Sequence, residues 1–395
     1  MIYLDNSATT RQYDEVSKLI YDISTETFGN PSSLHEVGFK AANVLREARE
    51  RTSACFPAGG EVYFTSGGTE SDNTALFGAC RKMKKRGRRV ITTAVEHPAI
   101  LEVCGRLAED GYEIIYLGTD KTGCINPDDL GDALTEDTAI VSIMTVNNEV
   151  GTIEPIIPAY NIVNEFNKEH GTKILFHTDA VQAFGKLDLT GLPCDMISIS
   201  GHKFHGPKGV GALYVKNGTN IGPFIYGGGQ ENGFRSGTEN LPGIAGMGLA
   251  CEMSCSNLTD KMAKIAEVNE YLYNGITSEL GEVVLNGPRE LGLTAAEGAG
   301  KRCPGVLNLS FTGTRGEVIL HTLEQDGIYV STGSACHSHH TGDSHVLTAM
   351  SMNHKEIEGA IRFSLSEFNT IEEMDFVIDK VKQAVTRFRK LGSFR

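Results

Sequence analysis

Short apolar runs alternate with helix-like segments from about residue 60 to residue 215, and this alternation constrains the fold more than any other feature. The runs lack the polar and apolar alternation of a sheet with one face in water, so helices are expected on both faces. They are Val62–Phe64, Arg89–Ile91, Ile114–Tyr116, Ala139–Ile143, Ile174–Phe176, Met196–Ser198 and Ala212–Tyr214. The pattern predicts an α/β domain with a mostly parallel central sheet flanked by helices.

The pattern changes after Gly243, where a long amphipathic helix near residues 258–280 is followed by fewer, more widely spaced strands. A chain of 395 residues exceeds one ordinary domain. We therefore predict a large α/β domain over residues 14–257 and a small α+β domain formed by residues 1–13 and 258–395. Because no repeat or low-complexity linker separates them, the two domains are expected to pack closely.

Charge and composition exclude several classes of function. The chain has 36 basic and 50 acidic side chains, and a net charge of −14 repels polyanions, so nucleic-acid binding is not expected. The start, Met1–Asn6, lacks a basic leader, and no apolar run approaches the roughly 18 residues of a membrane span. We expect a cytoplasmic protein without a membrane segment. Nine cysteines without a CxxC pair are expected to be mostly reduced and buried, with no metal site.

Two polar clusters follow predicted strands, where parallel sheets bind their ligands. In the first, Phe64–Asn73 reads as a strand, a glycine turn and a helix start, so backbone amides near Gly68 and Thr69 can seat a phosphate. An ordinary capped helix would have a similar sequence. In the second, Asp179 ends an apolar run, where its carboxylate either pairs with a cation or caps the next helix.

The third cluster, Ser198–Gly209, brings Lys203 to the end of another strand. A lysine there can form an imine, although a lysine on a glycine-rich surface loop would look the same. Together, a phosphate seat, an acid and a lysine suit pyridoxal 5'-phosphate, which needs its phosphate held, its ring nitrogen protonated and its aldehyde joined to a lysine. Neither a GxxxxGK[ST] nor a strand-linked GxGxxG motif is present, which disfavours a nucleoside triphosphate or a dinucleotide.

With these motifs the chain resembles the NifS/IscS-type cysteine desulfurases, which belong to the class V aminotransferase branch of the fold-type I pyridoxal-phosphate enzymes. The matching segments run from Tyr3–Asn6 to Arg362–Ser364 and cover nearly the whole chain. The resemblance implies that Lys203 joins the cofactor's aldehyde and moves the substrate's α-proton. It also implies that His97 is catalytic, stacking on the cofactor ring and shuttling protons, that Asp179 pairs with the ring nitrogen, and that Gln182 reaches the ring hydroxyl.

The resemblance assigns the remaining site residues as well. The implied phosphate holders are Gly68, Thr69, Ser200, His202 and, from a neighbouring subunit, Thr238. A homodimer is implied for the same reason. Asn148 and Arg362 are the implied holders of the substrate carboxylate, whose two oxygens match a guanidinium fork.

Cys336 distinguishes among the reactions that pyridoxal-phosphate enzymes catalyse. It ends Val330–Cys336 and precedes a stretch of polar residues, so we expect it on an exposed loop of the small domain, as a thiolate nucleophile requires. The resemblance implies that Cys336 attacks the sulfur of L-cysteine, carries a persulfide while alanine leaves, and passes sulfur to an acceptor or scaffold protein. This sulfur would serve iron–sulfur clusters or thio-cofactors. A structural cysteine at a turn is the alternative.

Some questions stay open at this point. His337, His339, His340 and His345 depart from the family pattern. They either are solvated side chains, or depress the pKa of the Cys336 thiol, donate a proton, or bind a soft metal together with Cys336. The chain ends shortly after Lys390, which leaves the identity of the sulfur acceptor open. A selenocysteine lyase, a cysteine sulfinate desulfinase or another class V aminotransferase is the alternative within this chemistry. A non-enzymatic persulfide or metal carrier is the alternative outside it.

Overall fold

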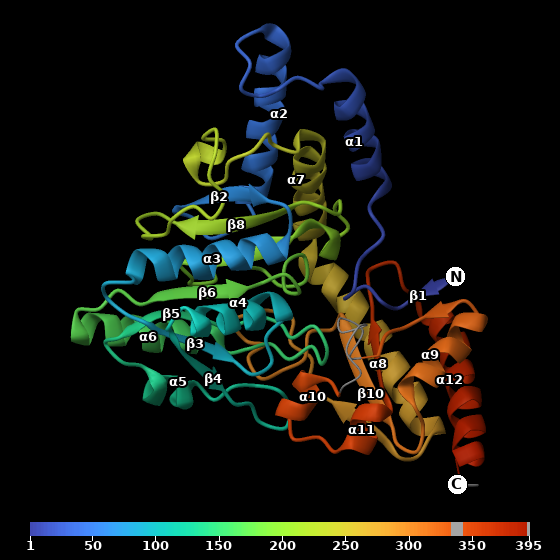
Figure 1. The fold of residues 1–395 in the computed structure, drawn as a ribbon. Coiled ribbons are helices and arrows are strands. Elements are labelled where there is room, and N and C mark those ends of the chain that lie inside the picture. Colours follow the sequence, from blue (N-terminus) through green and yellow to red (C-terminus); the bar gives the residue numbers. More distant parts are fainter. Residues whose placement is uncertain (333–342, 393–395) are drawn as a thin grey trace.

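A seven-stranded sheet is the central feature of the computed structural model, which describes residues 1–332 and 343–392 (Figure 1). Its strands lie in the order β2-β8-β7-β6-β5-β3-β4. They are β2 (Gly60–Thr65), β3 (Arg89–Thr93), β4 (Glu113–Leu117), β5 (Thr138–Ser142), β6 (Leu175–Asp179), β7 (Met196–Ser200) and β8 (Gly211–Lys216). All neighbours are parallel except β8, which is antiparallel to both β2 and β7. The mostly parallel sheet predicted from the apolar runs is confirmed.

Helices cover both faces of this sheet, as the continuous apolar runs predicted (Figure 1). Consecutive strand residues such as Ile140 and Val141 are both fully buried but belong to different core clusters, because successive side chains of a strand point to opposite faces. The helices of this part are α3 (Gly68–Met83), α4 (Pro98–Glu109), α5 (Pro127–Ala133), α6 (Ile156–His170) and α7 (Leu241–Cys255), with α1 (Asp14–Glu26) and α2 (Glu36–Ser53) packed on α7.

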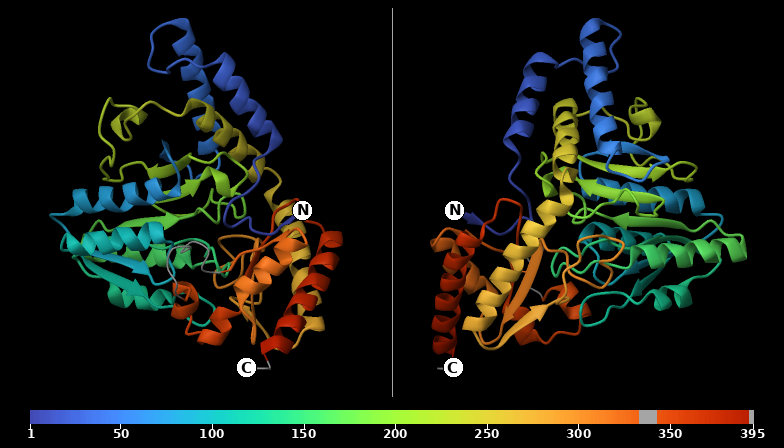
Figure 2. Two further views of the ribbon diagram at one scale, coloured as in Figure 1. Left: turned by 45° about the vertical axis from the view of Figure 1, so that its right-hand side comes forward. Right: turned by 180° about the vertical axis from the view of Figure 1, so that it is seen from behind.

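A smaller antiparallel sheet follows in the sequence and places β10 (Val306–Phe311) between β9 (Val283–Asn286) and β12 (Ala360–Ser364) (Figure 2). Its helices are α8 (Leu258–Glu279), α9 (Gly316–Gln325), α10 (His345–Ala349), α11 (His354–Glu358) and α12 (Ile371–Gly392). Strand β1 (Ile2–Tyr3) pairs with β11 (Ile328–Tyr329). One apolar cluster runs from Phe184 to Phe311, across the predicted domain boundary at residue 257, so the division into two domains stays a prediction.

The segment after β1, residues 5–13, crosses from the small sheet to the large one, and we call it the N-terminal strap. At one end the backbone amide of Asn6 donates to the Ser364 carbonyl over 3.2 Å. Further along, the amide of Thr10 donates to the His202 carbonyl over 2.9 Å, and the amide of His205 donates to the Thr10 hydroxyl over 2.7 Å. The strap therefore fixes the loop after β7 relative to β12.

Gly211 shows how closely the large sheet packs beside the first turn of α3. It begins β8, where it pairs with Thr65 on one side and Ser200 on the other. A side-chain carbon at this position would lie 2.6 Å from the Ile199 carbonyl oxygen and 2.7 Å from the backbone of Gly67. Only glycine lets the turn before α3 lie against the ends of β7 and β8.

None of the helices in the described part of the chain is both long and apolar enough to cross a membrane.

Candidate active site

A cavity of about 220 Å³ opens at the carboxyl ends of β2, β6 and β7, the edge at which the sequence placed the ligand. Residues from all three strand-end clusters line it, together with others from the N-terminal strap and the loops after β3 and β5. The lining residues are Ser7, Gly68, Thr69, Asp72, His97, Met144, Val146, Asn148, Asp179, Val181, Gln182, Ser200, His202 and Lys203. The fold thus brings together almost all the predicted cofactor residues, whose individual roles stay predictions.

Lys203 lies in a single 3₁₀ turn, Gly201–Lys203, directly after the buried strand β7. Its Nζ donates hydrogen bonds to the carbonyl oxygens of Ser7 over 2.7 Å and Ala8 over 3.0 Å. Because both carbonyls belong to the N-terminal strap, the strap forms the wall of the cavity next to the amine. The neighbouring His202 also contacts the N-terminal strap, because its Nδ1 lies 3.2 Å from the Thr9 hydroxyl.

Asp179 ends β6 with its side chain buried at the cavity. Burial raises the pKa of this carboxyl to about 6, although the hydrogen bond from the Val181 amide, 2.8 Å, and the charge of Lys203 lower it in part. A buried carboxylate without a close cation is costly, so a cationic group in the cavity would be stabilised here. Asp179 can therefore hold a protonated ring nitrogen.

A second acid, Asp72 of α3, also lines the cavity. It is 1% exposed, and burial together with the charge of Asp179 raises its pKa well above the usual range. The neighbouring His177 does not compensate these acids, because burial lowers its pKa to about 3 and keeps the ring neutral. Its two ring nitrogens lie 2.9 Å from the hydroxyls of Ser142 and Ser198. The floor of the cavity is thus acidic.

The start of α3, at the same cavity, suits an anion. The first backbone amides of α3 point to this end, and a helix N-terminus attracts phosphate. Gly68 is required there, because a side-chain carbon would lie 2.7 Å from Cγ2 of Val181. Ser200 and Thr69 contribute hydroxyls beside it. Burial, with the charges of Lys203 and Lys208, lowers the pKa of His202 to about 4, so His202 acts here through hydrogen bonds and not through charge.

Unpaired polar atoms around the cavity test whether pyridoxal 5'-phosphate fits. Ser7 Oγ, Asp72 Oδ1 and Gln182 Oε1 are buried without a hydrogen-bond partner among the described residues, and all three residues line the cavity. Buried polar groups normally have partners, so these atoms indicate a polar ligand. With the amine of Lys203, a phosphate seat and an acid around one cavity, the donor set fits this cofactor.

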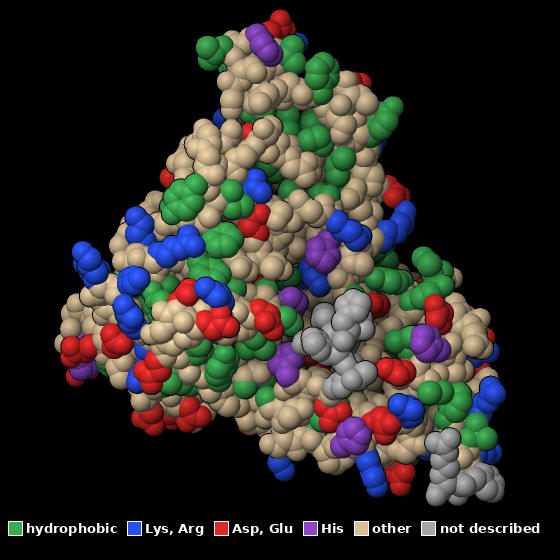
Figure 3. Space-filling model, in the orientation of Figure 1, with side chains coloured by type: hydrophobic (Ala, Val, Ile, Leu, Met, Phe, Trp, Pro, Cys, Tyr) green, Lys and Arg blue, Asp and Glu red, His purple; other side chains and the backbone are tan. Residues whose placement is uncertain are grey.

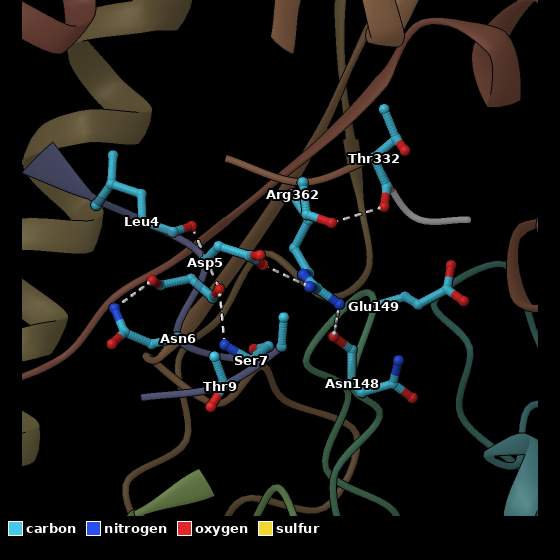
Figure 4. A network of polar contacts seen from close by, with 12 residues as sticks. Leu4, Asp5, Asn6, Ser7, Thr9, Asn148, Glu149, Thr332 and Arg362 are labelled. Atoms are coloured by element: carbon cyan, nitrogen blue, oxygen red, sulfur yellow. Dashed lines mark hydrogen bonds and ion pairs between the residues drawn. The ribbon is translucent and has the colours of Figure 1, made fainter. Parts of the chain in front are cut away.

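Arg362 of β12 does not line the cavity, unlike Asn148, whose carbonyl oxygen faces the Arg362 guanidinium in Figure 4. Its side chain is 2% exposed. Nη1 donates to the Asn148 carbonyl over 3.0 Å, and Nη2 donates to Oδ1 of Asp5 over 2.8 Å. The sequence predicted Arg362 and Asn148 as partners of one carboxylate, and they are neighbours. It did not predict Asp5, although an acid directly after a short apolar strand is the signal that identified Asp179.

The other residues named by the sequence are Thr238, Cys336 and the histidine group around it. Thr238 is exposed and does not line the cavity of its own chain. Cys336 lies outside the described residues, as do His337, His339 and His340 of the histidine group. His345 begins α10, and its Nε2 donates to the Glu96 carbonyl over 2.9 Å.

His97 is the N-cap residue of α4, directly before Pro98, and its orientation follows from this cap. Its Nδ1 accepts a hydrogen bond from the Ala99 amide over 3.1 Å. In the neutral ring the proton therefore lies on Nε2. The Glu96 carboxyl behind it is fully buried, which raises its pKa, and it accepts hydrogen bonds from the Met144 amide over 2.8 Å and the Thr93 hydroxyl over 3.0 Å.

Comparisons with known proteins agree with this geometry. The class-V aminotransferase family model matches residues 2–377. A cysteine desulfurase IscS of Dictyoglomus turgidum is 41% identical, over 100% of this chain and 97% of its own length. Among solved structures, a NifS-like protein superposes with a TM-score of 0.87 at 37% identity, covering 98% of this chain and 99% of its own. SspA in complex with cysteine has a TM-score of 0.77 at 32% identity, covering 94% and 100%.

The buried Glu149 next to Asn148 gives a pH-dependent prediction. Burial raises its pKa to about 7, while the Ser344 hydroxyl, which donates over 2.6 Å, and the charge of Arg362 lower it in part. Between about pH 4.5 and 7 the unfolded chain loses a proton that the folded chain keeps, so stability falls through this window, by on the order of 2–3 kcal/mol from this group. Glu149→Gln should flatten the fall in melting temperature between about pH 5 and pH 7.5.

Glu317→Gln is the matched control, because Glu317 is exposed on α9 and should leave the pH profile unchanged. The same steep fall in the wild type and in Glu149→Gln would show that Glu149 does not hold a proton in the folded protein.

Proposed function

The chain belongs to the class-V aminotransferase family and, within it, to the cysteine desulfurases, and from this premise we propose that the cavity around Lys203 takes sulfur from L-cysteine and leaves alanine. The observation that carries the proposal is the meeting of one amine, one acid and one helix N-terminus around the cavity, with Arg362 beside it. Membership of the family implies pyridoxal 5'-phosphate as cofactor. When bound, it supplies an aldehyde for the substrate amine and stores the electrons released at Cα.

The described residues have separate tasks in this proposal. Gly68, Thr69, Ser200 and His202 hold the phosphate, and the Asp179 carboxylate keeps the ring nitrogen protonated. Gln182 Nε2 donates to the Ser7 carbonyl over 2.8 Å, which leaves its Oε1 to accept a hydrogen bond from the ring hydroxyl. His97 stacks on the ring and can donate the proton on its Nε2.

Lys203 has two tasks, covalent attachment and proton transfer. The Lys203 amine must be neutral for both tasks. The carbonyls of Ser7 and Ala8 accept hydrogen bonds from Nζ, and such bonds can also stabilise the charged amine. These carbonyls therefore supply a place for Nζ once the substrate amine has replaced it. From there Nζ stays beside the cavity and can move the α-proton of the substrate.

We place the second half of the reaction on Cys336, outside the described residues. Support comes from the sequence setting, Ser334–Cys336 within a polar stretch, and from the cysteine desulfurases that match the whole chain. In this step the thiolate attacks the substrate sulfur, alanine leaves, and Cys336 holds the sulfur as a persulfide for an acceptor protein. The identity of that acceptor stays open.

A homodimer is part of the proposal. Large apolar side chains stand exposed on the α1–α2 hairpin and on the loop before α7, and Figure 3 shows hydrophobic side chains gathered over this end of the molecule. Phe28, Leu34, Phe39 and Tyr226 are each more than half exposed, with values of 73%, 104%, 66% and 73%. Such a surface favours burial against a second copy. Thr238 on the same loop, exposed in its own chain, would then reach the partner's phosphate seat.

Replacing the proposed attachment residue tests the cofactor assignment. Lys203→Ala should give a protein without the yellow colour of a bound imine and with alanine formation reduced at least about a thousandfold, because both covalent attachment and proton transfer are lost. Lys208→Ala, an exposed lysine five positions on, is the control and should keep both properties. A yellow, active Lys203→Ala would disprove the assignment.

Sulfur transfer is tested at Cys336. Cys336→Ser should still bind the cofactor, but sulfide release from L-cysteine in the presence of a reductant should fall by on the order of a hundredfold or more, because the nucleophile is missing. Cys255→Ser, a partly exposed cysteine at the end of α7, serves as the control. Unimpaired sulfide release by Cys336→Ser would show that Cys336 does not carry the persulfide.

A further inference from the structure

Arg362 already has an acid of its own chain on its guanidinium. Oδ1 of Asp5 lies 2.8 Å from Nη2, and the Asn148 carbonyl occupies Nη1 at 3.0 Å (Figure 4). The Arg362 side chain is 2% exposed, and among the described residues Asp5 is the acid that forms an ion pair with it, so loss of Asp5 would leave a buried cation without that partner. Asp5 therefore occupies a donor of Arg362, Nη2, that a substrate carboxylate would need.

The pairing of Asp5 with Arg362 is incomplete in a way that allows exchange. The structure gives a single hydrogen bond between the two side chains, whereas a guanidinium can bind a carboxylate through two parallel bonds. Nε of Arg362 has no hydrogen-bond partner among the described residues. The Asp5 side chain is 22% exposed, so its carboxylate has access to water when it leaves Arg362.

The backbone of residue 5 is held independently of this carboxylate. Its carbonyl accepts hydrogen bonds from the Ala8 amide over 3.0 Å and the Tyr3 hydroxyl over 3.1 Å. The next amide, of Asn6, is bound to the Ser364 carbonyl, and the Asn6 side chain donates to the same oxygen over 2.9 Å. The side chain of Asp5 can therefore swing away, or be replaced, without releasing the N-terminal strap.

We propose that Asp5 is a specificity-determining residue, whose carboxylate occupies Arg362 in the resting enzyme and is exchanged for the α-carboxylate of the substrate. The inference rests on the proposed function, because Arg362 is the proposed substrate holder. A two-point carboxylate ligand competes successfully with a one-point internal partner. A ligand that lacks a carboxylate leaves the internal pair in place and gains nothing from Arg362. Asp5 thus lowers the affinity for the substrate carboxylate and, in return, favours amino acids over amines that lack a carboxylate.

The test uses the holoenzyme and propionate, a carboxylate with neither amine nor thiol. Asp5→Asn keeps the shape and an acceptor oxygen but removes the competing charge. It should tighten propionate binding, measured by calorimetry, by roughly three- to tenfold, and lower the KM for L-cysteine by a similar factor. The affinity for propylamine should not change. Asp14→Asn, on an exposed carboxylate paired with Arg11, is the matched control and should behave as the wild type.

Several results would overturn the proposal. Weaker propionate binding by Asp5→Asn would show that Asp5 positions Arg362 and does not compete for it. Unchanged binding would show that the Asp5–Arg362 pair does not affect carboxylate binding. Asp5→Ser, which is shorter and also neutral, repeats the test if the asparagine variant does not fold. If the wild type formed no alanine from L-cysteine, the proposed function would fail, while the propionate titration would still decide the role of Asp5.

Discussion

The N-terminal strap is the constraint on which the site depends. Its backbone is bonded to β12 at Ser364 and to the loop after β7 at His202, and these two anchors belong to different sheets. Between the anchors, the carbonyls of Ser7 and Ala8 receive the amine of Lys203. A few backbone hydrogen bonds thus bring a lysine from the large sheet and an arginine from the small sheet to one short segment. Each bond contributes about 1 kcal/mol, but their common effect is geometric.

The second organising feature is a pair of buried acids at the cavity. Asp179 and Asp72 lie near each other at the cavity floor, His177 beside them is neutral, and burial raises the pKa of both acids. Such a floor favours a cation and disfavours any arrangement without one. The N-terminus of α3, which also lines the cavity, has the opposite preference. A ligand with a cationic ring and a phosphate satisfies both preferences at once.

Much of the fold and of the cavity follows from local sequence patterns. Runs such as Ala139–Ile143 are buried on both faces, so their composition identifies strands covered by helices. Asp179 and Lys203 each end such a run, so the parallel topology alone brings them to one edge. Because β8 is antiparallel, the local pattern could not give its direction, which depends on the pairing with β2 and β7.

The contacts that join distant segments could not be predicted in the same way. Asp5 and Arg362 are far apart in the chain, and their ion pair depends on the register between the strap and β12. Asp72 looked like one polar residue among several at a helix start, and its burial against Asp179 appears only when α3 is packed on the sheet. The role of Thr238 depends on a second copy of the chain, and Cys336 lies outside the described residues.

The most direct measurement is the identity of the lysine that carries the cofactor. Borohydride reduction of the holoenzyme makes the link permanent, and peptide mass spectrometry then locates it. The geometry of the strap and of β7 predicts that the added mass lies on Lys203 and on no other lysine. Modification of Lys208, or of the buried Lys186 near the same loop, would contradict the site described here.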